Sequence, residues 1–176
     1  MQKIRLILLL LISCQLMAQV QNNRLVLTRT IAQLVSEENQ QVISVTENGA
    51  VELKYPKYHQ LYKKQIKITT KSSQNTAENI FKHFDIKWNT AEILSSLKAI
   101  KTQNSSDLYV SSDPNPMTLD FYENNKLVWS LSIPNYLELK HYAPKNPQLA
   151  DLIALIDGMH SLSTHYIVKT LGENAQ

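Results

Sequence analysis

Thiols and glycines are scarce in this chain of 176 residues. It contains one cysteine, Cys14, and three glycines, at positions 49, 158 and 172. A single thiol cannot close an intramolecular disulfide or supply a cysteine-based zinc site. The glycines are too far apart to form the glycine-rich loop that holds phosphate in many nucleotide-binding folds. These absences argue against a disulfide scaffold and against folds that depend on such a loop.

Long hydrophobic runs are also absent, and the first apolar run is typical of an export signal. Lys3 and Arg5 form a short positive region, and the residues from there to Ile12 are apolar. This run is shorter than the roughly 18 apolar residues that a membrane-spanning helix needs. We therefore expect residues 1–18 to be a signal peptide and residues 19–176 to form one α+β domain.

Two cleavage sites compete at the end of this run. The stretch LISC at residues 11–14 resembles the bacterial lipobox, in which the cysteine receives a diacylglycerol group. The stretch LMA at residues 16–18 fits cleavage by signal peptidase I after Ala18. We favour the released form, because a signal that ends before Cys14 would be unusually short. The predicted location is the periplasm or the exterior, and the alternative is a lipoprotein anchored to the membrane through Cys14.

Charge gives no footprint of a nucleic-acid-binding surface. The formal net charge is +3, and loss of Lys3 and Arg5 with the signal lowers it to about +1. Six lysines between residues 54 and 71 alternate with Tyr, Ile and Thr, as on the solvated face of a strand. An anionic surface such as phospholipid or a cell-wall polymer is the alternative reading of this cluster.

Alternating aliphatic and polar residues predict a mainly antiparallel sheet. A meander is expected from strands at residues 24–30, 41–46, 51–55 and 62–70. Asn48-Gly49 predicts a type I′ turn between the second and third strands. Residues 31–39 are expected to form a loop or a short helical turn.

A second hairpin is expected around Glu123-Asn124-Asn125. Its strands are predicted at residues 117–122 and 126–133. Strict alternation would place one set of apolar side chains in the same layer, namely Leu119, Phe121, Leu127, Trp129, Leu131 and Ile133.

Capping signals predict two short helices and one longer C-terminal helix. The sequence Asn-Thr-Ala-Glu occurs at residues 75–78 and 89–92 and resembles a capping box, which predicts helices at 77–84 and 91–98. Asn146 and Pro147 begin an apolar pattern of helical period, which predicts the longest helix at 147–160. A final edge strand is expected at residues 164–170.

No catalytic or metal-binding constellation stands out. The five histidines lack the spacing of a zinc motif, and no nucleophile elbow occurs. His83 with Asp85, and Asp157 with His160, are close enough in sequence to form surface pairs. The candidates for a site of dispersed residues are Asp113, Asp157, His160 and His165. No cofactor or metal is predicted.

The order of these elements resembles an uncharacterised family of small secreted bacterial α+β domains. The resemblance is carried by RLVLTR from residue 24, VISVTENGAVELKY from residue 42, NTAE from residue 89 and LADLIALID from residue 149. It implies the fold and an envelope location, and it supplies no activity or site. That family carries a cysteine-containing stretch between its first two strands, and residues 31–39 here contain no cysteine.

Three functional hypotheses follow from these observations. The first is an exported noncatalytic envelope protein that binds another protein or a surface polymer, without a nucleic-acid partner. The second is an immunity or inhibitor protein that blocks an envelope-acting toxin or hydrolase. The third is an enzyme whose site is assembled from dispersed residues; the sequence favours the first of the three.

Intact-mass analysis of the processed protein tests the cleavage prediction. We expect a chain that starts at Gln19 with no modification, because the site after Ala18 allows a signal of ordinary length. A chain that starts at Cys14 and carries diacylglycerol would instead establish the lipoprotein.

Overall fold

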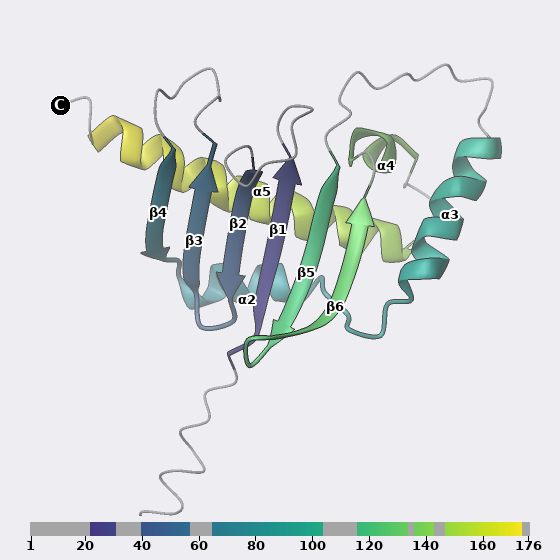
Figure 1. Ribbon diagram of the computed structural model, residues 1–176, viewed down its shortest axis with the longest axis horizontal. Coiled ribbons are helices and arrows are strands. Elements are labelled where there is room, and N and C mark those ends of the chain that lie inside the picture. The colour runs from purple at the N-terminus through teal and green to yellow at the C-terminus, as the bar shows by residue number, and fades with distance from the viewer. Residues whose placement is uncertain are drawn as a thin grey trace, which may run out of the picture.

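A six-stranded antiparallel sheet with its helices on one face forms the fold (Figure 1). The computed structural model describes residues 22–30, 40–56, 65–103, 116–133, 136–142 and 147–173. The strands are β1 (Arg24–Thr30), β2 (Gln40–Thr46), β3 (Ala50–Tyr55), β4 (Ile66–Lys71), β5 (Met117–Glu123) and β6 (Lys126–Ile133). The helices are α2 (Gln74–Phe81), α3 (Thr90–Gln103), α4 (Tyr136–Tyr142) and α5 (Pro147–Glu173). The predicted α+β class is confirmed.

The sheet grows in both directions from β1. Its order is β4-β3-β2-β1-β5-β6, so β1 to β4 form a meander and the β5–β6 hairpin joins the other side of β1. Leu27 of β1 lies opposite Ile43 of β2 and Leu119 of β5. Because side chains alternate across a strand, this register puts aliphatic residues of neighbouring strands on one face.

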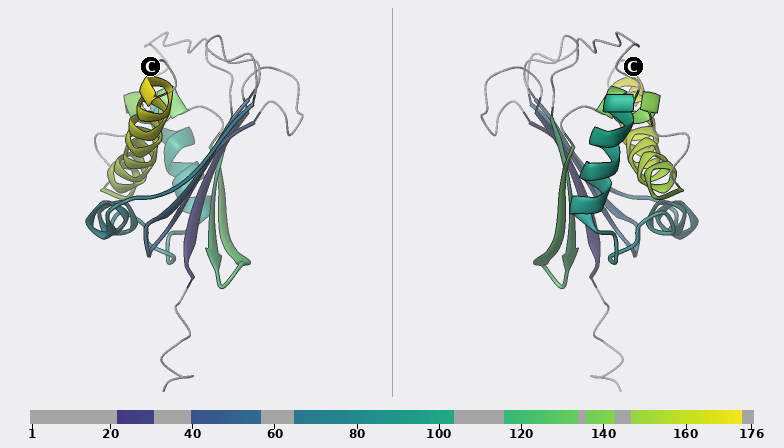
Figure 2. Two further views of the ribbon diagram at one scale, coloured as in Figure 1. Left: turned by 90° about the vertical axis from the view of Figure 1, so that its left-hand side faces the viewer. Right: turned by 90° about the vertical axis from the view of Figure 1, so that its right-hand side faces the viewer.

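The hydrophobic core lies between this aliphatic face and the helices. Strands contribute Leu25, Leu27, Ile43, Val45, Val51, Leu53, Leu119, Phe121, Leu131 and Ile133, all buried. The helix α5 runs across the same face (Figures 1 and 2) and contributes Leu149, Leu152, Leu155, Ile156 and Met159, all fully buried. Burial of a side chain of this size stabilises the fold by about 1.5–3 kcal/mol. The other face of the sheet carries polar side chains, including exposed Glu52, Thr69 and Ser130.

The two hairpins use different turns. Asn124 and Asn125 both have positive φ, 50° and 66°, which defines a type I′ turn between β5 and β6. In the first hairpin only Gly49 has positive φ, 85°, and its N–H donates to Thr46 O at 2.9 Å. The predicted type I′ turn at Asn48-Gly49 is therefore wrong. The loop holds three residues, Glu47 to Gly49, and its glycine takes the left-handed position.

A β-bulge changes the predicted facing of β6. Phe121 lies opposite Trp129, but the next residue, Tyr122, lies opposite Leu127, so Val128 is the extra residue. Trp129, Leu131 and Ile133 are buried as expected. Leu127 is 48% exposed, so its predicted place in the core is wrong.

The helix termini confirm one of the two predicted caps. The Asn89 side chain accepts from the backbone N–H groups of Ala91 and Glu92 at 3.1 and 3.3 Å, so it caps α3 as predicted. The cap of α2 is Ser73, whose hydroxyl oxygen accepts from Thr76 N at 3.2 Å. The predicted capping role of Asn75 is therefore wrong, because the chain becomes helical from Gln74.

The C-terminal helix is longer than predicted. It continues to Glu173, so the predicted edge strand at residues 164–170 is wrong. Contacts with the sheet explain the continuation: Ile167 is buried in the core, and the hydroxyl groups of Ser163 and Tyr55 are hydrogen-bonded. Tyr166 Oη donates to Lys71 O at 3.0 Å at the far edge of the sheet.

Two helices differ from the prediction in other ways. The helix α4 was not predicted, and α3 extends beyond the expected 91–98. The predicted loop at 31–39 lies outside the described residues. Among the helices of the described ranges, none combines the length and apolar character needed to cross a bilayer.

Replacement of Gly49 by alanine tests the first turn. A Cβ at this position would lie 2.8 Å from the backbone oxygen of Ser72, and φ is +85°. We expect Gly49→Ala to lower the free energy of unfolding by about 1–3 kcal/mol in urea denaturation. Gly172→Ala is the matched control, because a Cβ there meets nothing within 4 Å. It should be neutral or raise stability by up to about 1 kcal/mol, and an equal loss in both variants would contradict this account of the turn.

Candidate functional site

The structure separates the residues that the sequence suggested as site candidates. Asp113 and Cys14 lie outside the described residues. Asp157, His160 and His165 all lie on α5. Asp157 contacts α4, whereas His165 lines a groove between α5 and α2. Asp157 and His160 therefore lie together beside Tyr136 of α4, and His165 belongs to a different region.

Asp157 connects two helices through its carboxylate. Tyr136 Oη donates to Asp157 Oδ1 at 2.6 Å, and Lys140 Nζ lies 3.2 Å from Oδ1 and 2.9 Å from Oδ2. Both donors belong to α4, a helix that sequence reasoning missed. The signal was present in the spacing of Tyr136 and Lys140, which puts them on one helix face.

These contacts fix the charge states of the pair. Burial by itself would raise the pKa of Asp157, but hydrogen bonds from Tyr136 and Lys140 and the charges of Lys140 and His160 hold that pKa below its usual 3.8. Burial, and then the bond to Asp157, raise the pKa of Tyr136 far above 10.0. Asp157 is thus ionised at neutral pH, and Tyr136 is a neutral donor.

His160 lies one helical turn beyond Asp157, and its ring centroid is 6.1 Å from that of Tyr136. Burial and then the charge of Arg29 lower the pKa of His160 below 6.5, although the charge of Asp157 acts in the opposite direction. The group of Tyr136, Lys140, Asp157 and His160 is called the α4–α5 network below. Because both carboxylate oxygens of Asp157 accept hydrogen bonds, we assign the network to the attachment of α4 rather than to proton transfer.

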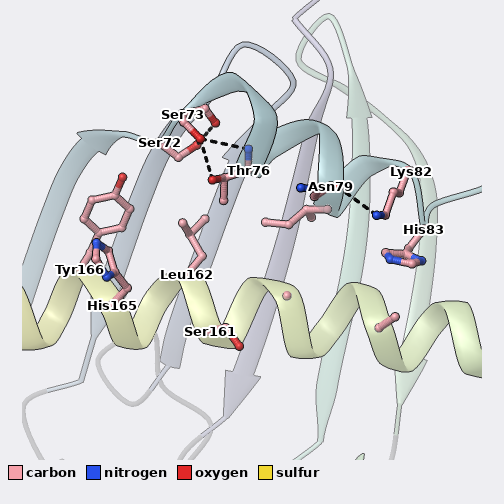
Figure 3. Close-up of a pocket in the computed structure, with 13 residues that line it drawn as sticks. Ser72, Ser73, Thr76, Asn79, Lys82, His83, Ser161, Leu162, His165 and Tyr166 are labelled. Carbon is pink, nitrogen blue, oxygen red and sulfur yellow. Dashed lines mark hydrogen bonds between the residues drawn. The ribbon is translucent and has the colours of Figure 1, made fainter.

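A groove with a volume of about 640 Å³ lies between α2 and α5 (Figure 3). Its lining includes the apolar residues Ile80, Ala154, Gly158 and Leu162. The helices approach closely at Gly158, where an added Cβ would lie 3.3 Å from Ile80 Cγ1. The lack of a side chain at Gly158 therefore sets the distance between the two helices.

Polar side chains from both helices form the remaining lining of this α2–α5 groove. The hydroxyl-bearing Ser72, Ser73 and Thr76 come from the start of α2, and Figure 3 shows His165 and Tyr166 beside them. The other end carries Lys82 and His83 (Figure 3). Sequence reasoning identified His165 alone, because nothing in the local sequence of α2 shows that it lies beside α5.

The hydrogen bonds of the groove residues order its lining. Lys82 Nζ donates to Asn79 Oδ1 at 3.0 Å. His83 Nδ1 lies 3.0 Å from Asp151 Oδ1 of α5, so the predicted pairing of His83 with Asp85 is wrong. Asp85 instead accepts from the backbone N–H of Lys87 at 2.8 Å. No carboxylate is among the described groove-lining residues.

Metal coordination has no support within the described ranges, where no three His, Cys, Asp or Glu side chains are placed to hold an ion together. Comparisons with protein-family models, with curated proteins and with solved structures found no match. The chain's own geometry is therefore the basis for a functional proposal.

The pH dependence of stability tests the α4–α5 network. The folded-state pKa of His160 lies below 6.5, so the unfolded chain binds this proton first as pH falls, and stability declines below about pH 6.5. Asp157 stays ionised in this range. We expect the free energy of unfolding, measured by urea denaturation, to fall less in His160→Gln than in the parent protein when the pH is lowered from 7.5 to 5.5.

The matched control is His165→Gln, which removes an exposed histidine from the same helix. This variant should keep the pH dependence of the parent protein. Identical pH dependence in the parent and His160→Gln would show that burial of His160 does not contribute.

Proposed function

We propose that this chain is an exported noncatalytic binding protein of the cell envelope, and that the α2–α5 groove holds a segment of an anionic surface polymer. The observation that carries the proposal is the composition of the groove lining. It combines apolar residues with hydroxyl, amide and nitrogen-bearing side chains, and includes no carboxylate. Pockets of about 300–1,000 Å³ with this combination are typical of ligand sites.

An anionic ligand fits the charge of the lining better than a cationic one. Lys82 supplies an ammonium group, a donor of hydrogen bonds, and the ring nitrogens of His165 can donate or accept hydrogen bonds. These residues lie toward opposite ends of the groove (Figure 3). Two separated nitrogen-bearing positions suit an extended chain with repeated anionic groups.

The apolar and hydroxyl-bearing parts favour a sugar polymer among anionic ligands. Ala154 and Gly158 are part-exposed and offer apolar surface for the C–H faces of sugar rings, whereas Ile80 and Leu162 form the buried floor beneath them. Ser72 donates to Gly49 O and Ser73 O, the Thr76 hydroxyl is hydrogen-bonded to Ser73 Oγ at 2.7 Å, and Asn79 Oδ1 accepts from Lys82 Nζ. The hydroxyl and amide groups of the lining are therefore held in place along α2. An acidic polysaccharide presents carboxylate, hydroxyl and C–H groups together, which matches this lining.

The proposed envelope location rests on the signal peptide predicted at residues 1–18 and on the low net charge expected after its removal. Asp157, one of the candidates for a site of dispersed residues, is hydrogen-bonded by Tyr136 and Lys140, which supports a structural role for this residue in attaching α4.

Binding of a fluorescent galacturonic acid oligomer tests the proposed site. We expect saturable binding to the parent protein. Lys82→Glu should lower the affinity at least about tenfold, or about 1.4 kcal/mol of binding free energy, because it replaces a positive group in the lining with a negative one. Lys87→Glu is the matched control, because Lys87 is also exposed but does not line the groove. It should change the affinity less than about twofold.

Three results would contradict the proposal. They are absence of saturable binding, equal weakening by both lysine variants, and equal binding of an uncharged dextran oligomer. Near-UV circular dichroism of each variant checks that the fold is retained.

A further inference from the structure

A second pocket lies at the other side of α2, where the first turn of the sheet, the end of β5 and the residues after α2 meet. Its volume is about 310 Å³. Its lining includes three carboxylates that are distant in sequence: Glu47 from the β2–β3 turn, Asp85 after α2, and Glu123 at the end of β5. The tertiary structure brings these carboxylates around one space, which we call the acidic pocket.

None of these carboxylates forms an ion pair within the described part of the chain. Glu47 Oε2 accepts from Asn23 Nδ2 at 3.1 Å, and Asp85 Oδ1 accepts from the backbone N–H of Lys87. Both donors are uncharged groups. All three side chains are exposed, so the pocket offers their negative charge to a cationic ligand.

A buried amide oxygen in the same lining independently points to a donor ligand. Asn23 is 8% exposed, and its Oδ1 has no hydrogen-bond partner among the described residues. Its Nδ2 is held by Glu47, and its backbone oxygen accepts from Glu47 N at 3.1 Å, so the side chain is fixed in this orientation. Buried acceptors normally have a donor, and a ligand with N–H groups could supply one.

Aromatic rings give the pocket an apolar side. Phe81, Phe84 and Phe121 are among its lining residues, and the centroids of Phe84 and Phe121 are 4.6 Å apart. Phe84 is held from behind by Trp88 and Trp129, at centroid distances of 5.8 and 5.3 Å. This aromatic cluster makes a rigid surface on which methylene groups can pack and over which a cation is attracted.

An exposed aliphatic residue extends this apolar side to the surface. Ile86 lines the pocket and is 50% exposed. A ligand with a hydrocarbon body would cover it. The lining thus offers apolar contact and negative charge to the same ligand.

We infer that the acidic pocket binds an aliphatic ammonium group, with its methylene chain against the phenylalanines and Ile86 and its nitrogen near the carboxylates and Asn23 Oδ1. A bare metal ion fits less well, because no three carboxylates or histidines in the described ranges are close enough to hold one together. The volume corresponds to the lower end of the range for small-ligand sites, about 300–1,000 Å³. The inference is independent of the proposed polymer site, which uses other residues of α2.

Calorimetric titration with 1-aminopentane and with N-acetyl-lysine methylamide tests this inference on the purified protein. The first probe represents a free amine, and the second represents a lysine side chain of a partner protein. The probe that binds more tightly shows which of these two ligands the pocket prefers. We expect saturable binding of at least one probe. The double variant Glu47→Gln/Asp85→Asn should weaken it at least about tenfold, since two charges are removed with little change in shape.

The matched control is Glu52→Gln/Glu78→Gln, which removes two exposed carboxylates that do not line the pocket. The affinity of this variant for the ammonium probes should stay within about twofold of that of the parent protein, because exposed charges at a distance are screened. The inference is overturned if neither ammonium probe binds, if both double variants weaken binding equally, or if 1-pentanol binds as well as 1-aminopentane.

Discussion

The packing of α5 against the aliphatic face of the sheet is the interaction on which the other features depend. Leu152, Leu155, Ile156 and Met159 are fully buried against strands that are themselves in register. With disulfides excluded by the single cysteine, this burial and the hydrogen-bonded ladders must hold the fold. The contact also fixes which sides of α5 stay available to other helices: Asp157 on one side binds α4, and Gly158 allows α2 to approach on another.

The helix α2 lies between two features of opposite charge. Asn79, Lys82 and His83 belong to the α2–α5 groove, whereas Phe81, Phe84 and Asp85, at the end of α2 and after it, belong to the acidic pocket. Within α2, helical geometry separates Asn79 from Phe81, because successive residues point about 100° apart around the axis. The chain leaves the helix after Phe81, and the turn that follows puts Lys82 and His83 on one side and Phe84 and Asp85 on the other. The low net charge of the whole chain hides this local separation of positive and negative groups.

Local chemistry accounts for both the correct and the wrong details. Asn89 caps α3 as its sequence predicts, but the identical tetrapeptide at residues 75–78 lies inside α2 because Ser73 begins the helix earlier. Residues 164–170 have strand-like composition, yet they are helical because Ser163 and Ile167 pack against the sheet. In β6, a bulge at Val128 turns Leu127 outward, and strict alternation has no means of showing an extra residue.

The sequence by itself determined the α+β class, the six strands of the sheet, the first-turn glycine and the first half of the C-terminal helix, because these follow from residue period and local turn chemistry. It also supplied Asp157, His160 and His165 as isolated candidates. Only the tertiary structure decided that Asp157 meets Tyr136 and Lys140, that His165 shares a groove with Lys82, and that Glu47, Asp85 and Glu123 surround one pocket. These contacts join segments far apart along the chain, and their positions depend on sheet register and helix packing rather than on any local pattern.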